Sequence, residues 1–550
     1  MAEAPLSLSG GSFGLNSAAR ESLTENEGGH HRDGDAEVKV CEEDDGVDES
    51  PDAPIKFNFS WKKLWRYMGP GWLMSLAYLD PGNLESDLQL GAFTGYSLVW
   101  VLWWATVVGL ILQEMAARIG VVSGRDLAQN VKRVYPYWLN VVIYINMELA
   151  VIASDIQEVV GSGIAINLLT DGWVPVWVGC IITGLDTFTF LAVHYLGVRY
   201  LEALICSLVA CMVICFYVNW GETPTNAGNL FQGWIVPILH SYGVSQAIQA
   251  IGAVIMPHNL YLHSGLVISR DIKRTSPNRV NEAIYYNFIE SALALLCSFF
   301  INLAIVAANA NSFFNPICTD KGDAGSPAAC LSLDAWYEGG NSADAFTSCQ
   351  IPGSDKMGRC GDIGLQLEGT ALKHGLGPFA LYVWAVGLLA AGQAATMTCT
   401  YAGQVIMGGC LEIELAAWKR VALTRGFALG PSVLVAWLSM QSNVYNTING
   451  LLNAFQSLQL PFAMLPLLHI SAQANIMGLF KSGFIKQFAN VLLAAIVMVV
   501  NAVLVVQYAQ GFSTGGIVLV SLYGVVYIFL CARMVLNRPA EQRLVSIQDP

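Results

Sequence analysis

Long apolar stretches dominate this chain and limit how it can fold. Hydrophobic residues make up 54% of its 550 residues and charged residues only 13%, a balance that is unusual for a soluble protein. A helix needs about 20 consecutive apolar residues to cross a bilayer. Such stretches recur near residues 67–93, 95–122, 137–168, 173–193, 199–219, 240–268, 282–309, 375–407, 419–439, 448–471, 486–508 and 513–535. The sequence therefore predicts an all-α polytopic membrane protein with twelve transmembrane helices.

The N-terminal segment differs from the rest of the chain. Residues 1–55 hold 14 acidic and 3 basic residues, so they account for most of the formal net charge of -13. The segment has no apolar period and cannot bury enough surface to offset the entropy of ordering it. We expect residues 1–60 to be a disordered acidic tail, 61–538 to be the membrane domain, and 539–550 to be a short C-terminal tail.

The positions of lysine and arginine predict the orientation in the membrane. Short loops that are rich in these residues stay on the cytoplasmic side of a bilayer. Basic residues precede the first predicted span and follow the second, sixth, tenth and twelfth spans. Both termini are therefore expected to be cytoplasmic.

A long polar connection at residues 310–373 falls on the opposite, extracytoplasmic face. It contains four cysteines, Cys318, Cys330, Cys349 and Cys360. Cysteines in such a compartment commonly form disulfides, and four of them allow three pairings that the sequence does not separate. A zinc site is the alternative, but no C-x-x-C spacing supports it.

Helix breakers interrupt the first and the sixth predicted spans. The first break is Asp80-Pro81-Gly82-Asn83 and the second is Met256-Pro257-His258-Asn259. Proline removes an amide donor and obstructs the carbonyl one turn earlier, so unwound backbone persists at this depth only where it lines a site. Two matching breaks, five helices apart, are typical of inverted repeats in secondary transporters. We expect these repeats at about residues 67–219 and 240–471.

The side chains at the two breaks predict a cation site of mixed character. Asp80 offers a carboxylate, Asn83 a neutral oxygen and Met256 a thioether, and the carbonyl of Ala253 is freed by the proline that follows. Mg²⁺ and Ca²⁺ prefer oxygen ligands alone, whereas softer transition-metal ions accept a thioether. A buried methionine or a proline kink alone is usually only packing. An aspartate inside a membrane span is a functional candidate by default.

The third predicted span carries an acidic face. Glu148, Asp155 and Glu158 follow one another at spacings of seven and three residues, which places them on one side of a helix. They form either a packing seam that is salt-bridged to Arg420 and Arg425 or a path for protons. Two histidines lie beside the second break. His258 and His263 are five residues apart and do not share a helical face, so they are not expected to bind one metal ion together. We expect them to act in proton coupling or gating, or to be structural hydrogen-bonding groups.

The two breaks together resemble the Nramp (natural resistance-associated macrophage protein) family of divalent metal transporters. The resemblance runs from about Trp61 to Arg538. Further matching motifs are Gly69-Pro70-Gly71, Ser154-Asp155-Ile156-Gln157-Glu158, Gly392-Gln393 and Gln456-Ser457-Leu458-Gln459-Leu460-Pro461-Phe462.

This resemblance implies a LeuT-like fold of two inverted five-helix repeats plus two extra helices. It implies proton-coupled import of Fe²⁺ or Mn²⁺ as substrates, with no permanently bound cofactor. Metal ligands would be Asp80, Asn83, Met256 and the Ala253 carbonyl, with Asn453 as a conditional ligand where bacterial relatives tend to carry glutamine. Asp80 would be the first proton acceptor and Asp155 the next.

Two other transporter functions fit the same fold. One is an Na⁺-coupled amino-acid symporter, whose site would need glycine-rich unwound backbone for a carboxylate. The other is a relative selective for Mg²⁺ or Al³⁺, against which Met256 argues. An enzyme is not expected, because the chain shows no nucleophile triad, phosphate loop or HExxH motif. We expect a monomer in a plasma, endosomal or vacuolar membrane that binds no nucleic acid.

Overall fold

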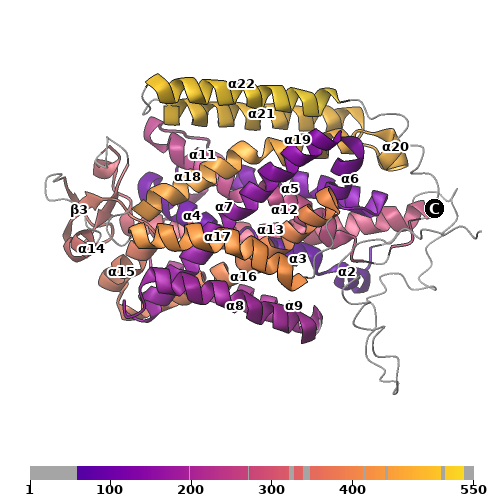
Figure 1. Ribbon diagram of the computed structural model, residues 1–550. Helices are drawn as coiled ribbons and strands as arrows, with labels where there is room; N and C mark the ends of the chain where they lie inside the picture. The colour runs from indigo at the N-terminus through magenta and orange to yellow at the C-terminus, as the bar shows by residue number, and fades with distance from the viewer. Residues whose placement is uncertain are drawn as a thin grey trace, which may run out of the picture.

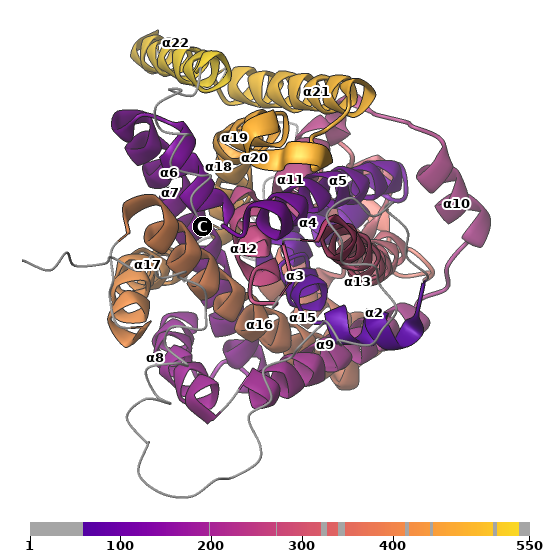
Figure 2. The same cartoon turned by 90° about the vertical axis from the view of Figure 1, so that its right-hand side faces the viewer.

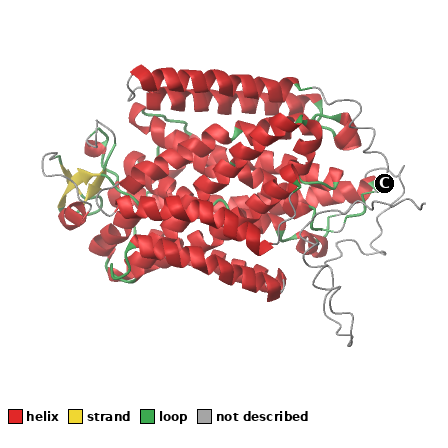
Figure 3. Ribbon diagram, in the orientation of Figure 1, coloured by secondary structure: helices red, strands yellow, loops and turns green. Residues whose placement is uncertain are grey.

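The computed structural model describes residues 59–196, 198–270, 272–274, 276–320, 327–338, 347–412, 417–439, 444–509 and 514–537. The two predicted tails therefore lie outside the described residues, except for Phe59 and Ser60. The described chain is a bundle in which most of the long helices run roughly along one direction (Figures 1 and 3). A small β-sheet sits at one end of the bundle.

The helices account for the twelve predicted spans. Among the described residues, six spans are long and apolar enough to cross a membrane: α5 (Val99–Ser123), α7 (Tyr137–Leu169), α13 (Pro277–Phe313), α16 (Pro378–Leu411), α18 (Val444–Gln459) with α19 (Pro461–Ser471), and α21 (Phe484–Ala509). Four more contain shorter apolar stretches: α8 (Val176–Leu196), α9 (Val198–Gly221), α17 (Ala417–Ser439) and α22 (Thr514–Leu536). The two remaining spans are the broken ones.

The first broken span consists of α3 (Pro70–Leu76) and α4 (Pro81–Thr94). The chain between them leaves the helical path, and Asp80 adopts an extended conformation as the N-cap of α4. Every residue of α4 is buried. Helix α7 passes very close to this break, because a Cβ atom on Gly161 would lie 2.4 Å from the Cβ of Pro81. The absence of a side chain at Gly161 therefore lets α7 and the break touch.

The second broken span consists of α11 (Val244–Val254) and α12 (Pro257–Val267). Met256 is extended and precedes Pro257, which begins α12 without needing an amide hydrogen. Both breaks thus follow the same local rule, an extended residue followed by a helix-starting proline. Viewed along the bundle, α3, α4, α11 and α12 occupy its centre, while α8, α9, α10, α17, α21 and α22 lie around them (Figure 2).

Short elements connect the spans. They are α2 (Trp61–Tyr67), α6 (Leu127–Val134), α10 (Ala227–Ile235), η1 (Ser241–Gly243), η2 (Pro316–Cys318), α14 (Leu333–Glu338), α15 (Leu365–Leu376), α20 (Ala474–Met477) and η4 (Gly478–Phe480). Buried apolar side chains form two large clusters. One involves residues of α5, α12 and α19, and the other involves residues of α7, α15 and α16.

The long Cys-containing loop after α13 contains a three-stranded antiparallel sheet that the sequence did not predict. Its strands β1 (Ala329–Leu331), β3 (Met357–Gly361) and β2 (Ser348–Gln350) pair in the order β1-β3-β2. Two disulfides hold this sheet, Cys318 to Cys360 and Cys330 to Cys349. The structure thus confirms the disulfide prediction and selects one of the three possible pairings. Because all four thiols are used, these cysteines form no zinc site.

Removing one of these disulfides should destabilise the loop. The Cys330 to Cys349 bridge closes 19 residues of chain, and constraining a loop of this length stabilises the folded state by about 3 kcal/mol. We expect a Cys330→Ser/Cys349→Ser variant to show a lower thermal unfolding midpoint in detergent. Cys297→Ser, which changes an unbridged cysteine, is the control. Equal midpoints for the loop variant and the wild type would contradict the prediction.

Candidate metal site

The first break presents two buried oxygen atoms that have no partner. Asp80 Oδ1 accepts hydrogen bonds from the backbone amide of Asn83 at 2.9 Å and from its side-chain amide at 2.6 Å. Asp80 Oδ2 and Asn83 Oδ1 are buried and have no hydrogen-bond partner among the described residues. Buried polar atoms are nearly always satisfied in folded proteins. These two oxygens are therefore well suited to a bound cation.

The second break contributes a sulfur atom and a backbone carbonyl. Met256 is buried, and its Sδ atom lies 3.9 Å from the hydroxyl of Ser154 on α7. Pro257 has no amide hydrogen, so the carbonyl of Ala253 lacks the donor that would continue the helix. This break can offer one soft and one hard ligand, as predicted from its composition.

Asn453 on α18 connects the two breaks. Its side-chain amide donates to the carbonyl of Gly82 at 3.3 Å in the first break. Its own backbone carbonyl lies against Gly252 of α11, where a Cβ atom would come within 2.5 Å of it. Gly252 directly precedes Ala253, so Asn453 touches both halves of the predicted site.

A network of amide side chains surrounds this connection. Gln157 Nε2 donates to Asn453 Oδ1 at 2.8 Å and to Asn449 Oδ1 at 2.6 Å, while Gln456 Nε2 donates to Gln157 Oε1 at 2.8 Å. The side-chain oxygen of Asn453 is thus already engaged. An amide oxygen has two lone pairs, so one of them is still open to a metal.

The acidic residues of α7 lie in different environments. Asp155 forms an ion pair with Arg425 of α17, and both side chains are only 5% exposed. Arg425 also donates to the carbonyl of Thr396 at 2.6 Å. Glu148 is half-buried nearer the start of α7 and is not in this pair. The side chain of Arg420, the other predicted partner, lies outside the described residues.

Glu158 on α7 contacts α16. Its Oε1 atom accepts hydrogen bonds from Ser154 at 3.1 Å and from the thiol of Cys399 at 2.8 Å. Its Oε2 atom is buried and unpartnered in the described structure. Since Ser154 also contacts Met256, the hydroxyl links this carboxylate to the thioether.

The two histidines face different helices. His258 Nε2 lies 3.6 Å from the sulfur of Cys399 on α16, and His263 Nε2 lies 3.4 Å from the hydroxyl of Ser291 on α13. Both rings are buried. They do not converge on one point, in agreement with their spacing in the sequence.

Four polar residues next to the site were not predicted as members of it: Gln157, Asn449, Gln456 and Cys399. Gln157 and Gln456 belong to the motifs of the family resemblance, and Asn449 is one helical turn from Asn453, so the sequence contains features that could have identified these three residues. No sequence feature identifies Cys399, because a cysteine in an apolar span is usually only a packing residue.

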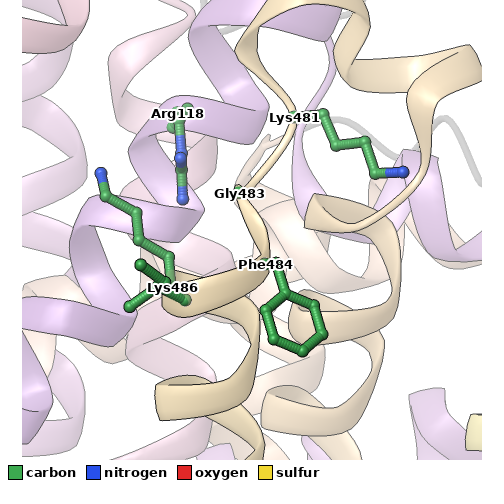
Figure 4. A pocket seen from close by; sticks show the side chains of 6 residues that line it. Arg118, Lys481, Gly483, Phe484 and Lys486 are labelled. Atoms are coloured by element: carbon green, nitrogen blue, oxygen red, sulfur yellow. The ribbon is translucent and has the colours of Figure 1, made fainter.

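A pocket of about 400 Å³ lies away from the broken helices, between α5 and the start of α21 (Figure 4). Its lining residues are Arg118, Lys481, Gly483, Phe484, Ile485 and Lys486. Arg118 forms an ion pair with Glu114 at 3.3 Å and donates to Ser482 at 3.1 Å. The predicted metal ligands, by contrast, are fully packed and line no part of this pocket.

A helical bundle with two matching broken helices at a buried polar centre defines a membrane transporter of the LeuT-like fold. A family model described as natural resistance-associated macrophage protein-like matches residues 71–333 and 357–507. The chain belongs to this Nramp family.

Similar proteins agree with this assignment. The chain is 41% identical over 519 residues to "Metal transporter Nramp4" of Arabidopsis thaliana, covering 92% of this chain and 93% of the relative. It is 43% identical over 469 residues to "Metal transporter Nramp2" of the same plant, covering 84% and 81%. A crystal structure of the Eremococcus coleocola manganese transporter matches with a TM-score of 0.71 at 25% identity, covering 91% of this chain and 98% of that chain. The predicted family and fold class are thereby confirmed.

Proposed function

We propose that this protein imports divalent transition-metal ions, Fe²⁺ or Mn²⁺, into the cytoplasm together with protons. The observation that carries the proposal is the pair of unpartnered buried oxygens on Asp80 and Asn83, together with the buried thioether of Met256 at the matching break. Relatives named as metal transporters and the similarity to a manganese transporter support it.

The proposed ligands explain a preference for transition metals. Asp80 Oδ2 supplies the negative charge, and Asn83 Oδ1 and the Ala253 carbonyl supply neutral oxygens. Met256 gains little from Mg²⁺ or Ca²⁺ but binds softer ions well. Asn453 is a conditional ligand, which would use the lone pair of its side-chain oxygen that does not accept from Gln157.

The proposed proton path starts at Asp80 and continues along α7. Glu158 lies close enough to Asp80 and Asp155 for their charges to interact. Arg425 stabilises the charged form of Asp155, so a helix movement that separates this pair changes where a proton is held. We assign the other predicted members of the path, Glu148, His258, His263 and Arg420, supporting roles in proton coupling or gating.

The alternative functions fit the site less well. An amino-acid symporter needs backbone donors for a carboxylate, whereas this centre presents the carboxylate of Asp80, which would repel one. A Mg²⁺ or Al³⁺ transporter needs an all-oxygen site, which Met256 does not provide.

We also propose the wider setting of this function. The repeats would span about residues 67–219 and 240–471, and both termini would be cytoplasmic because basic residues gather on that side. The protein would act as a monomer in a plasma, endosomal or vacuolar membrane, with neither nucleic acid nor a permanent cofactor.

Uptake into proteoliposomes tests the proposal directly. Purified protein is reconstituted, and uptake of Mn²⁺, Fe²⁺, Ca²⁺ and Mg²⁺ is measured with and without an inward proton gradient. We expect uptake of Mn²⁺ and Fe²⁺ that increases with the gradient, and little uptake of Ca²⁺ or Mg²⁺. Uptake of Mn²⁺ that does not depend on the proton gradient would contradict the proposed proton coupling. Equal uptake of all four ions would contradict the proposed preference for transition metals.

Replacing the thioether should reduce the selectivity. In Met256→Ala, we expect the preference for Mn²⁺ over Ca²⁺ to fall about tenfold, because the remaining ligands are all oxygen atoms. The measurement is competition of Ca²⁺ against Mn²⁺ uptake in proteoliposomes. Met212→Ala is the matched control, since Met212 is equally buried on α9 outside the site. An unchanged preference in Met256→Ala would show that the sulfur is not a ligand.

A further inference from the structure

A buried thiol lies beside the proposed metal site without a role in it. Cys399 on α16 is only 2% exposed. Its sulfur lies 2.8 Å from Glu158 Oε1 on α7 and 3.6 Å from His258 Nε2 on α12. Three helices thus bring together a thiol, an imidazole and a carboxylate.

Simple packing does not account for this arrangement. A buried cysteine usually behaves as a small apolar residue among other apolar residues. Cys399 instead faces two polar groups, and the second oxygen of Glu158 is fully buried and lacks a partner among the described residues. An unsatisfied buried carboxylate oxygen next to a thiol and an imidazole nitrogen points to a positively charged ligand.

The spacing of the donor atoms fits metal coordination. Two ligand atoms bound to one tetrahedral metal at about 2.0–2.3 Å lie roughly 3.5 Å apart. The sulfur of Cys399 and Nε2 of His258 are 3.6 Å apart, which matches the spacing of two ligands on one ion. Thiolate and imidazole together favour ions such as Zn²⁺ and Cd²⁺ over Mn²⁺.

We propose that Cys399 and His258 form a second station for thiophilic divalent cations, next to the site at Asp80 and Met256. This proposal deepens the proposed transport function, on which it rests for the route by which the ion arrives. Ser154 connects the two stations, because its hydroxyl contacts both Met256 Sδ at 3.9 Å and Glu158 Oε1 at 3.1 Å. A soft ion bound to the thioether therefore has a stronger sulfur ligand close by.

Binding at this station moves one proton from the thiol to Glu158. The thiol gives its hydrogen to Glu158 Oε1, which already accepts it in a hydrogen bond, and the sulfur then binds the metal as a thiolate. One S–H bond is exchanged for one O–H bond and one metal–sulfur bond, so charge and atoms balance. Thiophilic ions would be held longer than Mn²⁺, and Cys399 would thus determine how the protein handles them.

Cadmium binding to the purified full-length protein tests the proposal. Cd²⁺ is titrated into protein in lipid nanodiscs, and the sulfur-to-cadmium charge-transfer band in the ultraviolet is recorded. We expect Cys399→Ser to lose one high-affinity Cd²⁺ site, with affinity at that site weakened at least about tenfold. In proteoliposomes, the same variant should change the ratio of Cd²⁺ to Mn²⁺ uptake by a similar factor.

Cys410→Ser is the matched control, because Cys410 is equally buried on the same helix. Cys211 and Cys215, whose sulfurs lie 4.0 Å apart, provide a background signal that both variants retain. Cys399→Ala repeats the measurement if the serine variant folds poorly. An unchanged band and uptake ratio in the Cys399 variants would overturn the second station. Absence of Mn²⁺ uptake by the wild type would instead refute the transport function, since the binding measurement does not depend on transport.

Discussion

Asp80→Asn should abolish metal uptake while leaving the fold intact. Asparagine keeps an oxygen and is as good an N-cap as aspartate, so the start of α4 at Pro81 is preserved. The substitution removes the negative charge among the proposed ligands. We expect Mn²⁺ uptake in proteoliposomes to fall at least about 100-fold, because losing even an outer partner of a metal ligand costs up to this factor.

The control for this prediction is Asp334→Asn, which removes the same charge from an exposed position in the long Cys-containing loop. It should transport Mn²⁺ like the wild type. Thermal unfolding of Asp80→Asn in detergent shows whether the fold is retained. If a well-folded Asp80→Asn protein transports at the wild-type rate, the assignment of the whole site fails.

Arg425→Gln should be among the most destabilising single substitutions in the membrane domain. It leaves the carboxylate of Asp155 buried without its cation, and breaking a buried ion pair from one side costs about 3–5 kcal/mol. It also removes the bond from Arg425 to the Thr396 carbonyl, which ties α17 to α16. We expect a clear drop in the thermal unfolding midpoint and loss of proton-driven uptake.

A double variant distinguishes the effect of the unpaired charge from the effect of losing the arginine side chain. Asp155→Asn/Arg425→Gln removes both charges and should recover much of the stability that Arg425→Gln loses, but not the proton dependence of uptake. Lys373→Gln is the surface control. Its partner is Asp171 at 3.4 Å, and the two side chains are 41% and 79% exposed, so its loss should cost at most about 1 kcal/mol. If the double variant is no more stable than Arg425→Gln, the ion pair is not the source of the effect.

The spans and the breaks were predictable because the bilayer imposes simple rules. The length of the apolar stretches predicts the unbroken spans, and Pro81 and Pro257 mark the points where a new helix begins. The small sheet around Cys330 was not predictable, since its strands are only three to five residues long and are held by disulfides whose pairing depends on the folded loop.

Members of the candidate site were predictable only where the side chain is charged and its insertion into a membrane span costs free energy. Asp80 and Asp155 are such residues, and the structure places both in buried, polar surroundings. The amide network around Gln157 depends on how α7 and α18 meet, which no spacing within one helix reveals. Cys399 is the clearest case, because its importance comes entirely from partners on two other helices.

The two breaks also determine the electric field at the centre of the protein. Helices α3 and α11 end there and α4 and α12 begin there, and each helix end carries about half a charge, negative at C-termini and positive at N-termini. Two ends of each sign largely cancel. The carboxylate of Asp80 is then the one formal charge among the residues of the breaks. A divalent ion bound there leaves one positive charge unbalanced, and protonation of the neighbouring Glu158 decides whether the loaded centre is neutral or cationic.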